Sequence, residues 1–183
     1  ACRPLLTLQS PLPCFLSSLS SLSPPFPPPP AAVVSTFCRD NRGLGPRERA
    51  TLSGTVYTVL RKKLLFDHFA PSGSGPKERR MAILGFYGPG DFLRSALTEQ
   101  ETNWIDQCEK INVADLMERH RHNLPEWLVQ PLKDELGDDF WQLADSLNLG
   151  AGLDLRVNAL NAKRADVQKE LAQLGIKALP TPY

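Results

Sequence analysis

The spacing of the apolar residues changes at Gly152, and this change constrains the fold more than any other feature of the sequence. Before it, apolar residues recur at helical spacing. One such stripe, on a helix expected to start at Pro46, contains Leu52, Val56, Val59, Leu60 and Leu64. Over residues 153–159, apolar and polar residues alternate, which is typical of a strand. The sequence therefore predicts a mainly α protein, with a helical bundle over 31–149 and a β-α-β piece over 150–183.

The β-α-β piece is predicted from three short segments. The strand over 153–159 is followed by a helix over 163–174, and a second strand is predicted over 176–179. Two strands and one helix cannot bury both faces of a sheet. We therefore expect residues 150–183 to be the truncated start of a larger α/β subdomain.

Two details inside the helical part predict how its helices begin and pack. Thr98 and Glu101 have the spacing of a capping box, so the helix behind them should bury Trp104, Ile105 and Cys108. Gly54 lies inside a predicted helix, where it costs about 1 kcal/mol relative to alanine. We expect this glycine to allow a close approach by another element.

Residues 1–30 differ in composition from the rest of the chain. They hold nine prolines and a single charge, Arg3. A secretory signal needs a basic start and an uninterrupted apolar stretch, and the prolines interrupt this one. The composition favours a disordered or polyproline-like leader. The alternative that this segment is not native coding sequence stays open.

Cysteine and histidine spacing gives no sign of a metal site. Cys2, Cys14, Cys38 and Cys108 lack the close pairs of structural zinc sites. His120 and His122 would point apart on a helix, so we expect them in an exposed loop rather than around a metal. With no apolar run of about 18 residues, the sequence predicts a reduced, cytoplasmic protein without a membrane partner.

The net charge of +1 hides an asymmetry between the two halves of the chain. Residues 1–90 hold 11 basic and 4 acidic residues, whereas residues 91–183 hold 10 and 16. Such a division favours a charged working face. A basic cluster on two neighbouring predicted helices could neutralise RNA phosphates, although a solvated helix face is the alternative. The cluster consists of Arg39, Arg42, Arg47, Arg49, Arg61, Lys62 and Lys63.

Two further groups of polar residues are candidates for RNA contact. Lys77, Arg79 and Arg80 would extend the basic surface if they fold beside it. On the predicted strand, Arg156 and Asn158 share the polar face, shortly before Lys163. Such residues can contact an RNA backbone or sugar, while an ordinary half-exposed strand is the alternative.

Two stretches carry a resemblance to a known family. One is Leu-Gly-Pro-Arg-Glu-Arg-Ala at 44–50, which runs into Val-Tyr-Thr-Val-Leu-Arg at 56–61. The other is Leu-Asp-Leu-Arg-Val-Asn at 153–158, followed by Lys163-Arg164. In this order and spacing, residues 31–183 resemble the N-terminal part of the Sun/Nop family of RNA (cytosine-5) methyltransferases. The likeness is strongest to the bacterial small-subunit (16S) ribosomal RNA methyltransferase B group.

The resemblance implies a NusB-like, all-helical RNA-binding domain over 31–149, then a small α/β subdomain, then a methyltransferase domain. It also implies a mechanism in which a cysteine thiolate adds to C6 of cytosine, and C5 then takes a methyl group from S-adenosylmethionine. The family's Ala-Pro-Gly-Gly-Lys loop and Thr-Cys motif are absent from this sequence. Pro13-Cys14 precedes the helical part and does not match the family's Pro-Cys. We therefore predict no catalytic and no cofactor-binding residue in this chain.

Three hypotheses follow for the function of the chain. The first is an RNA-docking N-terminal portion of a ribosomal RNA cytosine-C5 methyltransferase that lacks its catalytic domain and is inactive alone. The second is a non-enzymatic NusB-like regulator of transcription that binds RNA and a protein partner. The third is a helical scaffold without RNA affinity. The oligomeric state stays open.

Overall fold

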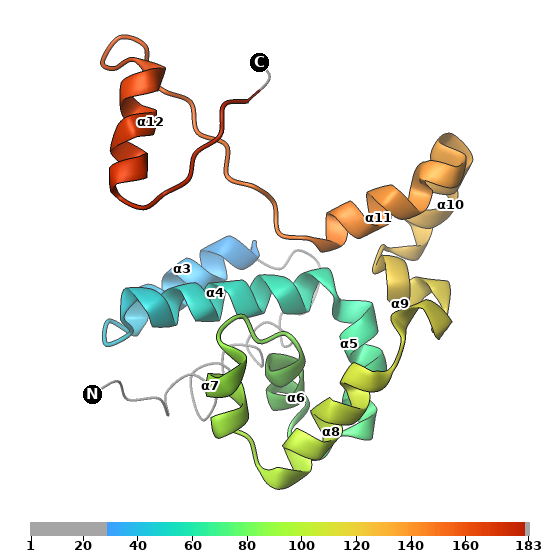
Figure 1. The fold of residues 1–183 in the computed structure, drawn as a ribbon. Coiled ribbons are helices and arrows are strands. Elements are labelled where there is room, and N and C mark those ends of the chain that lie inside the picture. Colours follow the sequence, from blue (N-terminus) through green and yellow to red (C-terminus); the bar gives the residue numbers. More distant parts are fainter. Residues whose placement is uncertain (1–28, 182–183) are drawn as a thin grey trace. The chain divides into compact units, whose positions relative to one another are not determined.

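The computed structural model describes residues 29–181, shown in Figure 1. Most of the predicted leader therefore lies outside the described residues. The chain divides after Gly150 into two compact units. The helices of the first unit are α3 (Pro30–Asp40), α4 (Pro46–Arg61), α5 (Lys63–Phe69), α6 (Lys77–Leu84), α7 (Gly90–Ser95), α8 (Glu99–Lys110), α9 (Glu118–His122), α10 (Glu126–Leu136) and α11 (Phe140–Asn148). Short 3₁₀ turns lie at Ala70–Ser72, Val113–Asp115 and Gly137–Asp139.

Helix α4 supplies the centre of the core. Pro46 occupies its first turn, where a missing N–H costs nothing, and the Glu48 carboxylate accepts the Gly45 N–H at 2.6 Å. The predicted inward residues Leu52, Val56 and Val59 are buried. Leu60 is 37% exposed, contrary to the prediction. The chain leaves the helical conformation at Lys62, so the stripe does not continue in a straight line into α5.

Close packing around two glycines joins α4 to the segment that ends α6. A Cβ on Gly54 would lie 2.2 Å from the Tyr87 ring, and one on Gly85 would lie 2.4 Å from a methyl group of Val59. The Tyr87 N–H donates to Thr55 Oγ1 at 3.0 Å, which holds the two segments in contact. The predicted close approach at Gly54 is confirmed.

Helix α8 begins with the predicted capping box. The Thr98 N–H donates to Glu101 Oε2 at 2.9 Å, and Thr98 Oγ1 accepts the Glu101 N–H at 3.3 Å. Trp104, Ile105 and Cys108 are buried as predicted. The Trp104 indole N–H finds its partner in Ser72 Oγ at 3.0 Å.

The prediction of an exposed loop around the histidines is wrong. His120 and His122 lie on α9 and are only 2% and 3% exposed. The His120 ring stacks on that of His68 at 4.3 Å between centroids. Asn123 adopts the left-handed conformation that ends α9, and its Oδ1 accepts the Leu65 N–H at 3.0 Å. This turn draws α9 against α5 and buries the His120 ring, whereas the His122 ring lies against Phe140 and Trp141 of α11.

The second unit, which begins at Ala151, contains α12 (Arg164–Gln173), as predicted. The strands predicted over 153–159 and 176–179 are wrong for the described residues, which contain no strand. A strand is stable only when its N–H and C=O groups pair with a neighbour, and no described segment pairs with either stretch. Leu153 accordingly stays 84% exposed. The mainly α class is confirmed, while the β-α-β piece is not formed here.

The helices in the described part of the chain are too short or too polar to cross a lipid bilayer.

Candidate nucleic-acid interface

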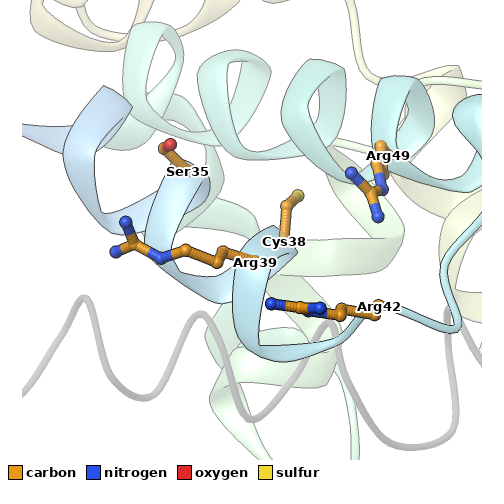
Figure 2. A pocket seen from close by; sticks show the side chains of 5 residues that line it. All are labelled: Ser35, Cys38, Arg39, Arg42 and Arg49. Atoms are coloured by element: carbon orange, nitrogen blue, oxygen red, sulfur yellow. The ribbon is translucent and has the colours of Figure 1, made fainter.

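Three arginines line an open hollow between α3 and α4, which we call the arginine hollow (Figure 2). Its volume is about 510 Å³. The turn over residues 41–45 brings the chain back along α3, and buried Leu44 anchors that turn. Side chains of both helices can therefore face one space. The hollow is lined by Ser35, Cys38, Arg39, Arg42 and Arg49.

Hydrogen bonds to neutral acceptors fix two of these guanidinium groups. Arg49 Nε donates to the Leu44 carbonyl at 2.9 Å, and Arg39 Nη2 donates to Thr36 Oγ1 at 3.1 Å. No acidic residue lines the hollow, and within residues 29–181 none of its arginines forms a salt bridge. The hollow therefore holds three uncompensated positive charges and is suited to an anion with several oxygens.

The other predicted cations of the basic cluster are arranged in two ways. Arg47 is exposed, and Arg61 and Lys62 are half-buried; none of them has a carboxylate partner among the described residues. Lys63 instead pairs with Asp67, which also binds Lys77 at 2.8 Å. Burial opposes the ionisation of Asp67, but the hydrogen bonds from both lysines hold its pKa below the ordinary value. Lys63 and Lys77 thus carry compensated charges.

Arg79 and Arg80 do not extend the basic surface. Arg79 forms a two-pronged ion pair with Glu101, with Nε–Oε1 at 2.5 Å and Nη2–Oε2 at 2.9 Å. The hydrogen bond from Arg79 lowers the pKa of Glu101 to about 2, although burial acts in the opposite direction. Arg80 donates to the carbonyls of Ala70 and Gly73 and so fixes the loop between α5 and α6. Both arginines hold the fold together.

In the second unit, Arg156, Asn158 and Lys163 are all exposed. Residues 156–160 line an open hollow of about 530 Å³. The Asn158 Oδ1 accepts the Leu160 N–H at 3.1 Å, which stabilises a turn rather than a strand. The alternation in sequence therefore does not place Arg156 and Asn158 on one face of a sheet.

Sequence reasoning missed Ser35 and Cys38 as parts of the site. The signal was present, since residues 35, 38, 39 and 42 follow one face of a helix at i, i+3, i+4 and i+7. Ser35 and Cys38 are neutral, and a prediction based on charge does not include them. What could not be read from the sequence is that this face meets Arg49 across a turn.

A nucleotide-type cofactor is usually bound where a glycine-rich loop joins a strand to a helix, and residues 29–181 contain no strand. The same residues hold no group of His, Cys, Asp and Glu side chains that could bind a metal ion.

Comparison with protein families finds a match for the C-terminal part of the chain. Residues 124–183, about a third of the chain, match the family described as "Methyltr_RsmF/B-like, ferredoxin-like domain". No curated protein and no solved structure matches the chain. The matched region contains α10, α11 and α12, without the strands of a ferredoxin-like α/β fold. Residues 124–183 are thus similar in sequence to the ferredoxin-like domain of RsmF/B-like methyltransferases.

Proposed function

We propose that this chain forms the RNA-docking part of an S-adenosylmethionine-dependent RNA cytosine-C5 methyltransferase that acts on small-subunit ribosomal RNA. The observation that carries the proposal is the family match over residues 124–183. A methyltransferase of this kind must bind its RNA substrate, which is a polyanion. The uncompensated arginines of the first unit supply the matching charge.

The charges argue for docking through the RNA backbone. Each phosphate that a cation neutralises releases counterions, which makes the affinity fall as salt rises. Arg42, Arg47, Arg49, Arg61 and Lys62 have no carboxylate partner among the described residues. Arg156, Asn158 and Lys163 are exposed in the second unit and would add contacts. Lys63 contributes less, because Asp67 already balances its charge.

The match also bears on the choice between the hypotheses. A non-enzymatic NusB-like regulator of transcription would also need a basic face to bind RNA. That hypothesis does not explain why residues 124–183 match a methyltransferase-type family. The family resemblance supports the enzyme. In this proposal the described residues supply RNA docking, and methyl transfer belongs to the catalytic motifs of the family.

The test is a titration of a small-subunit ribosomal RNA fragment with the full 183-residue chain, followed by fluorescence anisotropy at several salt concentrations. Three neutralised phosphates predict a loss of affinity of about tenfold or more between about 50 and 200 mM salt. Reversing charge with Arg47→Glu, Arg49→Glu and Lys62→Glu should weaken binding at low salt. Lys110→Glu, an exposed change on α8, is the control. Equal affinity of wild type and the triple variant would refute the docking role of this face.

A further inference from the structure

The arginine hollow differs from the paired basic residues of the fold because it gathers three arginines in one lining without an internal counter-charge. Arg94 binds Asp106 and Glu109, and Lys133 binds Glu118. Arg39, Arg42 and Arg49 gather on one hollow without a carboxylate in its lining. Three like charges around one hollow repel each other. A bound anion would remove that repulsion.

The hollow is also arranged before any ligand arrives. The bonds from Arg39 to Thr36 and from Arg49 to the Leu44 carbonyl restrict the rotation of both side chains. They use one side of each guanidinium group and leave its other N–H groups for a ligand. Side chains held in place lose less entropy on binding, so this hollow should contribute more affinity than an exposed cation such as Arg47.

The residue types indicate which anion fits. All the cations in the lining are arginines, whose planar fork of N–H donors matches two oxygens of a phosphate. Ser35 adds a neutral hydroxyl, which can bond to a phosphate oxygen or to a ribose hydroxyl. The volume of about 510 Å³ exceeds the space of a single small ion and lies within the range of about 300–1,000 Å³ that is typical of ligand sites.

We infer that the arginine hollow binds adjacent phosphodiester groups of the RNA backbone, with Arg39, Arg42 and Arg49 as its phosphate-binding residues. This inference rests on the proposed function and adds to it the place where backbone contact is concentrated. The remaining basic residues of the first unit then act mainly through their long-range field.

The thiol of Cys38, which lines the arginine hollow, can report whether the hollow is covered. Figure 2 shows its side chain among those of Arg42 and Arg49, and the residue is partly accessible. RNA seated on the arginines would cover the Cys38 thiol. Cys108 is 7% exposed, and burial raises the pKa of its thiol, so it reacts slowly. Cys2→Ser and Cys14→Ser remove the other two thiols, which leaves Cys38 as the reactive one.

The experiment measures the rate of Cys38 alkylation by iodoacetamide in this full-length background, with RNA, with inorganic phosphate and with neither. Saturating RNA should slow alkylation at least about fivefold, as a covered site predicts, while phosphate at the same phosphate concentration should not. In parallel, we measure the slope of log affinity for RNA against log salt concentration. Arg42→Gln and Arg39→Gln should each reduce the magnitude of this slope by about 0.7. Lys110→Gln should leave both readouts unchanged.

Each other outcome has a definite meaning. If RNA binds but Cys38 reacts at its free rate, and Arg47→Gln weakens binding as much as Arg42→Gln does, the hollow is refuted while RNA docking survives. If inorganic phosphate protects Cys38 as well as RNA does, the hollow is a general anion site and the inference is overturned. If the chain binds no RNA at all, the proposed function fails as well.

Discussion

Arg79 on α6 and Glu101 on α8 are joined by two charge-assisted hydrogen bonds, 2.5 Å between Nε and Oε1 and 2.9 Å between Nη2 and Oε2. The same carboxylate accepts the Thr98 N–H at 2.9 Å and thereby also closes the capping box. One side chain thus links the start of α8 to α6. The pair also explains why a cation-rich stretch of sequence does not add to the basic surface.

The Arg79–Glu101 pair should make the protein sensitive to acid. The folded-state pKa of Glu101 is about 2, below its ordinary value of 4.5. Its stabilisation, about 3 kcal/mol by linkage, is present above pH 4.5 and is lost as the pH falls through about 2. Glu101→Gln should lower the free energy of unfolding at pH 7 and flatten its decline between pH 5 and pH 2. Urea unfolding at several pH values measures this. If the free energy of unfolding declines with falling pH to the same extent in wild type and in Glu101→Gln, the prediction is contradicted.

Gly54→Ala should destabilise the fold even though alanine favours a helix by about 1 kcal/mol. The new methyl group would overlap the Tyr87 ring near its attachment to the backbone, which requires the segment itself to move. Overpacking of this kind costs about 1–3 kcal/mol. Thermal and urea unfolding measure the loss. Tyr87→Ala in the same background should restore stability, and a loss that persists there would place the conflict elsewhere.

Buried His120 on α9 predicts a second pH dependence. Burial lowers the pKa of His120, and the charges of His68 and Arg119 act in the same direction. The unfolded chain then binds more protons below about pH 6.5, so the free energy of unfolding should fall as the pH drops from 7 to 5. His120→Phe keeps a ring against His68 but cannot titrate. The variant should lose less stability over this range, and an identical loss would show that His120 does not contribute.

Hydrogen exchange should distinguish the two units. The amides of residues 151–158 and 177–179 have no strand partners among the described residues and should exchange at nearly unprotected rates. Amides of α4 between Leu52 and Val59 lie in the core and should be strongly protected. Protection within 153–158 equal to that of α4 would show that these residues form a sheet in solution.

The parts of the fold that depend on neighbours in sequence were predictable, because a helix closes its own hydrogen bonds. The start of α4 at Pro46 and the Thr98 capping box both follow from local chemistry. A strand depends on a partner from elsewhere, so alternation at 153–159 could indicate a strand without forming one.

The charged residues of the candidate site could be predicted from the sequence, but their partners could not. Charge density identified Arg42 and Arg49, but it could not separate them from Arg79, which lies in the same basic half of the chain. Only the fold shows that Arg79 has Glu101 as its partner, whereas Arg42 faces a hollow without acids. The burial of His120 likewise depends on α5, which is distant in sequence.

Photocrosslinking tests the central claim most directly. A small-subunit ribosomal RNA fragment that carries 4-thiouridine is bound to the full chain, irradiated and digested, and the crosslinked peptides are identified by mass spectrometry. The docking account predicts crosslinks concentrated in residues 35–49, which contain the arginine hollow, and their loss in the Arg39→Gln, Arg42→Gln double variant. Crosslinks confined to the acidic segment over 99–145, or none above the level of an unrelated protein, would contradict it.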